Sequence, residues 1–158
     1  MAYRVAPAPE LPATEDARAG RLRAAGLRVT LPRLAVLAVL DDAAAADAHL
    51  SAASIARRVR ERAGSISTQG VYDCLDVLVE GGLLRRIEPA GQPALFEARV
   101  HDNHHHLVCR SCARVTDVPC VTGATPCLTP AGPAGFLVEE AEVTFWGTCA
   151  ACAASPAA

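Results

Sequence analysis

Two cysteine pairs in the second half of the sequence have the spacing of a zinc site. Cys109 and Cys112 form one CxxC motif, and Cys149 and Cys152 form the other. Each motif can present two thiolates to one tetrahedral ion. Four thiolates favour zinc over harder ions and leave no open coordination position. Because 36 residues separate the two motifs, tertiary structure must bring them together, and the predicted zinc site is structural.

A histidine-rich stretch, HDNHHHLVCRSC (101–112), leads directly into the first CxxC motif. If HHHLVC is a β-strand, side chains alternate, so His104 and His106 point to one face and His105 to the other. Two imidazoles on one face make half of a metal site, and carboxylates must supply the rest. His101 and His105 are then spare. The alternative is a solvated histidine loop.

Candidate partners for these imidazoles lie on both sides of the stretch. Glu97 and Asp117 are near enough in sequence to fold onto the same face, and His49 could reach it from the N-terminal half. A set of nitrogen and oxygen ligands suits Fe(II) or Mn(II), with Zn(II) or Ni(II) as substitutes. The sequence therefore predicts a second metal site that is chemically distinct from the four-cysteine site.

Three further cysteines have less defined roles. Cys120 and Cys127 lie in a proline- and glycine-containing segment (119–135) that disfavours a long helix. They are a candidate redox pair, or simply small residues, since no neighbouring base or helix N-terminus is evident. Cys74 lies within an expected helix and is better explained as a small buried apolar residue than as a sensor.

Length and composition indicate a folded chain without a membrane span. The 158 residues are 51% hydrophobic and 20% charged, enough for one ordinary domain or two small ones. No apolar run approaches the roughly 20 residues of a membrane span. The first 20 residues lack the apolar core of a secretory signal. We therefore expect a cytoplasmic protein, in which cysteines serve metal or redox chemistry and not disulfides.

Basic residues concentrate near the N-terminus. All 15 are arginine, and five of them fall within residues 17–33, which contain no acidic residue. Residues 101–158 are instead net negative. An arginine-rich segment is more often a solvated helix face than a phosphate-binding one, so charge alone does not establish DNA binding.

Capping residues and periodicity place three helices and a hairpin. The helices are expected after Thr30, Ser51 and Ser67, and Gly81-Gly82 ends the third. Residues 83–100 then read as two short strands around a Pro/Gly turn. Short helices followed by a β-hairpin predict a winged helix-turn-helix, whose recognition helix enters the major groove of DNA.

On that arrangement the third helix is the recognition helix. Thr68, Gln69 and Tyr72 lie at its exposed start, where side chains reach base edges or phosphates. Alternatively, Tyr72 packs internally and Gln69 is only solvated. Asp73 and Asp76 would repel phosphate, so they are expected to face away from DNA.

Together these motifs resemble the ferric uptake regulator (Fur) family of metal-dependent bacterial repressors. The resemblance covers residues 17–152 and is carried by HHHLVCRSC with the second CxxC, GLRVTLPR (26–33) and STQGVYDCLDVLVEGGLLRRIE (67–88). Within the family, FEARV-x-DNHHHLVCRSC, the VYD of the recognition helix and DVPC…PCLT look closest to actinobacterial FurA/CatR-type regulators. Those are associated with catalase-peroxidase genes and are relatives of the peroxide sensor PerR.

The resemblance implies an α+β homodimer. Its expected parts are a disordered or frayed arm (1–17), a winged-helix domain (18–97), a hinge (98–103) and an α/β dimerisation domain with the structural zinc (104–158). The implied regulatory metal ligands are His49, Glu97, His104, His106 and Asp117. Tyr72 falls on the base-contacting tyrosine, and Arg23, Arg28 and Arg33 fall in the stretch that meets the DNA backbone.

The resemblance also implies a mechanism. A metal bridging the domains would lock the dimer onto a palindromic operator, and metal loss would relieve repression. In the peroxide sensors, Fe(II) reacts with peroxide and a ligating histidine is oxidised, which points here to His49 and His104. Glu97 stands where those sensors have aspartate and iron-responsive members often have glutamate. We expect a peroxide-responsive repressor of catalase-type genes, with an iron-responsive repressor of uptake genes as the alternative.

A different class of protein would also use CxxC motifs. A thiol redox enzyme or metal carrier would cycle them as exchangeable dithiols. Catalytic CxxC motifs usually begin a helix in a βαβ setting, and neither motif here has that context. The sequence therefore favours a regulator over an enzyme.

Overall fold

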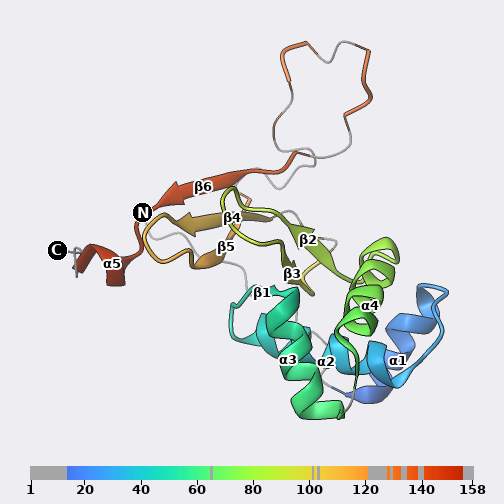
Figure 1. Cartoon of the computed structure of the whole chain (residues 1–158). Helices are drawn as coiled ribbons and strands as arrows, with labels where there is room; N and C mark the ends of the chain where they lie inside the picture. The colour runs from blue at the N-terminus through green and yellow to red at the C-terminus, as the bar shows by residue number, and fades with distance from the viewer. Residues whose placement is uncertain are drawn as a thin grey trace. The chain divides into compact units, whose positions relative to one another are not determined.

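The computed structural model describes residues 14–64, 66–100, 102, 104–120, 128, 130–132, 135–138 and 141–154 (Figure 1). The chain divides into two compact units, one ending at Val100 and the other running from residue 101 onward. None of the helices in the described part is long and apolar enough to cross a bilayer.

Four helices form most of the N-terminal unit: α1 (Glu15–Ala24), α2 (Leu31–Ala45), α3 (Ala52–Ala63) and α4 (Thr68–Glu80). As the sequence predicts, Ser51 and Ser67 cap α3 and α4, and their hydroxyls accept from the backbone N–H three residues on. Thr30 begins α2 without a side-chain cap. Pro32, in the first turn of α2, has no N–H to be satisfied.

Helix α1 was not among the helices predicted from the sequence. Residues 15–17 belong to α1, whereas the expected arm ran to residue 17. The hydroxyl of Thr14 accepts from the N–H of Ala17, and Glu15 and Asp16 lie in the first turn, where acidic side chains favour the helix dipole. These local signals favour a helix that starts at Glu15. Residues 1–13 lie outside the described part.

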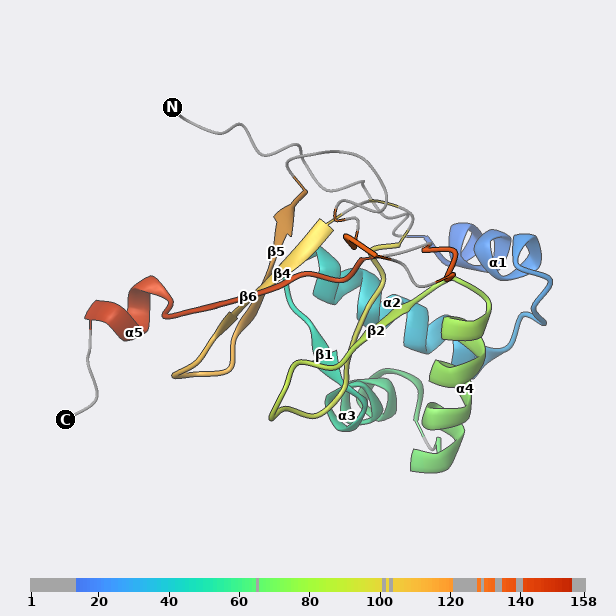
Figure 2. The same ribbon diagram turned by 90° about the horizontal axis from the view of Figure 1, so that it is seen from above.

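A small antiparallel sheet completes this unit. Its strands are β1 (Leu50–Ser51), β2 (Arg85–Ile87) and β3 (Leu95–Glu97), in the order β1-β3-β2. Helix α2 packs against α1, α3 and α4 (Figure 2). The core contains fully buried side chains from all four helices: Leu22, Leu37, Leu40, Ile55, Val59, Val71, Leu75 and Leu78. This is the predicted arrangement of helices followed by a β-hairpin.

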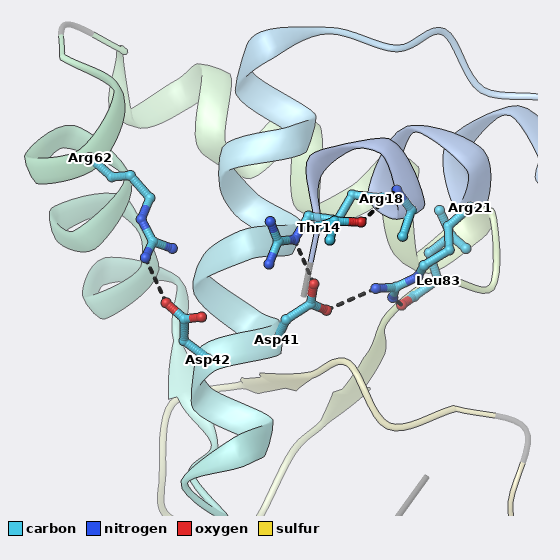
Figure 3. A network of polar contacts seen from close by, with 8 residues as sticks. Thr14, Arg18, Arg21, Asp41, Asp42, Arg62 and Leu83 are labelled. Atoms are coloured by element: carbon cyan, nitrogen blue, oxygen red, sulfur yellow. Dashed lines mark hydrogen bonds and ion pairs between the residues drawn. The ribbon is translucent and has the colours of Figure 1, made fainter. Parts of the chain in front are cut away.

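A buried carboxylate joins α1 to α2. Asp41 accepts from Nε of Arg18 at 2.6 Å and from Nη1 of Arg21 at 2.8 Å (Figure 3). Arg21 also donates to the carbonyl oxygen of Leu83 at 3.4 Å. The Asp41 side chain is only 4% exposed. Two of the five arginines in residues 17–33 therefore have an internal structural role.

The C-terminal unit is built on a second three-stranded sheet. Its strands are β4 (His104–Cys109), β5 (Val115–Pro119) and β6 (Thr144–Gly147), in the order β5-β4-β6. Strand β4 is antiparallel to β5 and parallel to β6. The short helix α5 (Ala150–Ala154) follows β6 directly (Figure 1). Helix and sheet in both units give the predicted α+β class.

Candidate metal centres

The four predicted zinc ligands come together in the C-terminal unit. The sulfur atoms of Cys109, Cys112, Cys149 and Cys152 all lie within 4.8 Å of one another. Those of Cys112 and Cys149 are 3.8 Å apart. A tetrahedral zinc with bonds of about 2.3 Å places its sulfur ligands roughly 3.8 Å apart. Both the donor set and this spacing fit a structural zinc ion.

Strand pairing explains how two distant motifs meet. Cys109 ends β4 and is paired with Gly147 of the parallel strand β6, which brings the second CxxC motif beside the first. In the turn after β4, the N–H of Ala113 donates to the carbonyl oxygen of Cys109 at 2.9 Å. Ala113 has φ of 61°, in the left-handed region that favours glycine. The tight turn that presents Cys109 and Cys112 therefore carries backbone strain.

Hydrogen bonds within the cysteine cluster separate the acidities of its thiols. The backbone N–H of Cys149 donates to Sγ of Cys109 at 3.3 Å and, with the N–H of Cys112, lowers the pKa of Cys109 to about 6. The pKa of Cys152 is raised to about 12, chiefly by hydrogen bonds with the sulfurs of Cys149 and Cys112. Of these two thiols, Cys109 is the more acidic. A bound zinc ion displaces the protons from all four thiols.

The remaining cysteines lie apart from this cluster in sequence. Cys120 is half-buried just after β5, and Cys127 lies outside the described residues, so their pairing stays a prediction. Cys74 is half-buried in α4 and packs against the core. Burial raises its thiol pKa more than the positive charge of Arg33 lowers it. A thiol with a raised pKa is a poor nucleophile, in keeping with a packing role for Cys74.

The N-terminal unit places two predicted regulatory ligands side by side. Leu50 of β1 is paired with Phe96 of β3, so the antiparallel register puts His49 directly across from Glu97. Nε2 of His49 lies 2.8 Å from Oε2 of Glu97. The two side chains are only 3% and 4% exposed. A buried imidazole and carboxylate, 48 residues apart in sequence, thus form one compact pair.

The C-terminal unit contains the other three predicted regulatory ligands. His106 is paired with Asp117 across β4 and β5, with Nε2 3.7 Å from Oδ1. The rings of His104 and His106 have centroids 5.1 Å apart. The ring of His105 instead lies 6.1 Å from that of Phe145. Strand alternation therefore separates His105 from the other two imidazoles.

Sequence reasoning missed one residue beside this set. Nδ1 of His104 lies 2.9 Å from Oδ1 of Asp102, and the His104 side chain is fully buried. A carboxylate two residues before a candidate ligand was the only signal in the sequence. Because Asp102 lies outside every segment with helical or strand periodicity, no pattern in the sequence placed it beside His104.

The donor atoms define the chemistry of each set. The N-terminal unit offers one imidazole and one carboxylate, and the C-terminal unit offers two imidazoles and one carboxylate. Such nitrogen and oxygen donors suit divalent transition metals and differ from the four thiolates. Neither set alone offers enough donors for a six-coordinate Fe(II) or Mn(II) ion.

The start of α4 carries the predicted DNA-contacting residues. Thr68, Gln69 and Tyr72 are exposed, and the exposed fraction of Tyr72 is 41%. The opposite side of α4 carries the buried residues Val71, Leu75 and Leu78. This amphipathic division leaves the three predicted contacts accessible to a nucleic acid.

The prediction that Asp73 and Asp76 face away from DNA stays a prediction, but helix geometry places both residues beside a predicted contact. At about 100° per residue, both fall on the same stripe of α4 as Gln69, and both are exposed. Nε2 of Gln69 donates to Oδ1 of Asp73 at 2.8 Å. A carboxylate therefore lies among the predicted base-contacting side chains.

The predicted backbone-contacting arginines precede or begin α2. Arg23 and Arg28 are exposed and Arg33 is half-buried. Nη1 of Arg33 donates to the carbonyl oxygen of Arg28 at 2.9 Å. This contact supports the chain ahead of α2 and leaves the guanidinium of Arg28 at the surface.

Comparison with known proteins identifies similar sequences. The profile of the ferric uptake regulator family matches residues 24–122. The transcriptional regulator FurA of Mycobacterium tuberculosis is 48% identical over 137 residues, which cover 87% of this chain and 90% of FurA. The ferric uptake regulation protein 1 of Mycolicibacterium fortuitum is 49% identical over 129 residues, covering 82% and 78% of the two chains.

Solved structures share the fold. The ferric uptake regulator of Vibrio cholerae superposes with a TM-score of 0.66 at 27% identity, covering 83% of this chain and 98% of that one. The regulator from Pseudomonas aeruginosa, solved with manganese, gives a TM-score of 0.66 at 27% identity, covering 84% and 98%.

Proposed function

Since this chain belongs to the ferric uptake regulator family, we propose that it is a repressor that responds to peroxide and controls catalase-type antioxidant genes. Family membership, as predicted from the motifs, makes the chain a metal-dependent transcriptional regulator that binds DNA and forms dimers, and not an enzyme. The thiol redox enzyme considered from the CxxC motifs is thereby set aside. The peroxide response rests on the subgroup resemblance of the histidine and cysteine segments.

The observation that carries the proposal is the presence of two chemically different metal-binding sets. The cysteine cluster has the donors and spacing for structural zinc. The buried imidazoles and carboxylates suit a regulatory Fe(II) or Mn(II) ion, with Zn(II) or Ni(II) as substitutes. We assign that regulatory ion to His49, Glu97, His104, His106 and Asp117.

In this proposal the regulatory ion controls DNA binding. His49 and Glu97 belong to the DNA-binding unit, and the other three ligands belong to the C-terminal unit. An ion that all five residues share would restrict the link at residues 98–103. The two recognition helices of a homodimer would then have the spacing needed to enter successive major grooves of a palindromic operator. Loss of the ion releases this restriction and ends repression.

Peroxide sensing would act through the same residues. Fe(II) held by these residues would lend one electron to break the O–O bond of hydrogen peroxide and would regain it as the histidine ring is oxidised, so that peroxide is the net two-electron oxidant. His49 and His104 offer ring carbons that accept one oxygen atom, while the second oxygen leaves as water. An oxidised ring is a poorer ligand, so metal binding and repression are lost in that molecule.

One residue favours a second candidate function. Glu97 resembles the glutamate of iron-responsive family members, whereas peroxide sensors have aspartate there. An iron-responsive repressor of uptake genes would use the same five ligands. It would release DNA when iron is scarce, without oxidation of the protein.

Two measurements test and separate these functions. Zinc-loaded protein should bind a palindromic operator only when Fe(II) or Mn(II) is added, and equal binding without these ions would overturn metal control. After peroxide treatment, mass spectrometry should find one added oxygen on His49 or His104 in the Fe(II) form and none in the Mn(II) form. Oxidation confined to Cys120 and Cys127 would transfer sensing to thiols, and no oxidation would favour the iron-responsive repressor.

A further inference from the structure

Asp102 contacts a predicted regulatory ligand from outside the ligand set. Its Oδ1 lies 2.9 Å from Nδ1 of His104. The His104 side chain is fully buried, whereas that of Asp102 is 29% exposed. The contact spans only two residues of chain, from the segment before β4 to the first residue of that strand. A carboxylate thus reaches from a partly exposed position to a buried imidazole.

We infer that Asp102 is the positioning residue for His104. An ionised carboxylate only accepts hydrogen bonds, so a contact at 2.9 Å requires the hydrogen of the neutral ring to be on Nδ1. The lone pair that can bind a metal is then on Nε2. Asp102 thereby selects the tautomer and the orientation of the ring. The inference rests on the proposed role of His104 as a regulatory ligand.

Because the His104 ring is buried, its tautomer and orientation affect how it can bind a metal. Ligating histidines commonly donate their second ring N–H to a carboxylate, which holds the ring in place and increases its basicity. His106 lies next to His104 on the same face, with ring centroids 5.1 Å apart. A change in the tilt or tautomer of His104 would therefore alter the angle between two neighbouring donors. Asp102 also lies in the segment expected as the hinge (98–103), so it links that segment to the ligand set.

The test uses the full-length, zinc-loaded chain and Co(II) as the probe. Asp102→Ala should lower Co(II) affinity about 10- to 100-fold, the usual cost of removing a residue that supports a ligand. Asp102→Asn should recover part of this loss, because the amide oxygen still accepts from Nδ1–H. Glu142→Gln removes one charge from an exposed residue of the same unit and should change affinity less than twofold. The zinc content of each variant verifies that the unit is folded.

A second measurement is independent of the variants. Long-range proton–nitrogen NMR of the wild-type chain, without the regulatory ion and with the ring neutral, should show hydrogen on Nδ1 of His104. Hydrogen on Nε2 overturns the inference, as does an Asp102→Ala variant with wild-type affinity or an equal loss in Glu142→Gln. Failure of the proposed function gives a different result, since neither the wild type nor His104→Ala would then bind Co(II) beyond the zinc site.

Discussion

His49 and Glu97 face each other across two antiparallel strands, with Nε2 of His49 2.8 Å from Oε2 of Glu97. Both side chains are buried, so each supplies the other with a polar partner inside the N-terminal unit. Burying a carboxylate costs free energy unless it is hydrogen-bonded or coordinates a metal. The imidazole therefore fixes the position of Glu97, from which the carboxylate would bind the proposed regulatory ion.

Replacing Glu97 should remove regulatory metal binding and leave the zinc site intact. Glu97→Gln keeps the size of the side chain but removes its anionic donor. Its Mn(II) affinity should fall by more than the ~10–100-fold loss expected for a residue that only supports a ligand. Operator binding in the presence of Mn(II) should fall in parallel, measured by fluorescence anisotropy. Glu88→Gln, at an exposed carboxylate in the same hairpin, should behave as wild type, and equal losses in both variants would contradict the assignment of Glu97.

The two carboxylates at the end of α2 should differ widely in their contribution to stability. Asp41→Asn leaves two mostly buried guanidinium groups without their carboxylate and should lower the free energy of unfolding by about 3 kcal/mol. Asp42→Asn removes only an exposed ion pair with Arg62, which is worth less than about 1 kcal/mol. Urea unfolding followed by circular dichroism compares the two. Equal losses would mean that the Asp41 network adds nothing beyond surface charge.

Local signals in the sequence predicted the helices well. Ser51 and Ser67 are N-caps, and a cap depends only on residues within one turn. Strand β1, with two residues, could not be predicted, because such a short strand exists only through its pairing with β3. The contact between His49 and Glu97 depends on this same non-local pairing. Spacing could therefore suggest the two residues as ligands but could not place them together.

For Asp73, charge and helix geometry lead to different expectations. Its expected orientation was argued from its charge, whereas the 3.6-residue repeat places residues 69 and 73 one above the other. Asp102 was missed for another reason. It lies in a segment without periodicity, and its partner becomes evident only when His104 is seen to be buried.

The two CxxC motifs should retain zinc independently of the other cysteines. Cys112→Ser removes one of the four thiolates and should leave much less than one zinc per chain, measured by elemental mass spectrometry. The C-terminal unit should also lose thermal stability, because zinc binding contributes directly to folding. Cys120→Ser should keep one zinc per chain. Loss of zinc in that variant would show that the ligand set is not Cys109, Cys112, Cys149 and Cys152.

The turn that presents the first cysteine pair should become more stable with glycine. Ala113 has φ of 61°, where a non-glycine residue costs roughly 1–2 kcal/mol. Glycine avoids that cost but loses more entropy on folding, so Ala113→Gly should gain about 0.5–1 kcal/mol. The zinc-bound chain should then melt at a higher temperature and release zinc more slowly to a chelator. Ala53→Gly, at an exposed site in the first turn of helix α3, should instead lose stability, by at most about 1 kcal/mol.

Asp73 should limit the affinity of the recognition helix for DNA. Its carboxylate shares the exposed stripe of α4 with Gln69 and accepts from the amide of that residue at 2.8 Å. Asp73→Asn removes a charge that repels phosphate, while the amide oxygen of the new side chain can still accept from Gln69. Affinity for a random duplex should rise severalfold at low salt, and the gain should shrink at high salt because screening weakens repulsion between charges. Glu80→Gln, at the far end of α4, should have a smaller effect. An unchanged affinity for Asp73→Asn at every salt concentration would show that this stripe does not face the DNA.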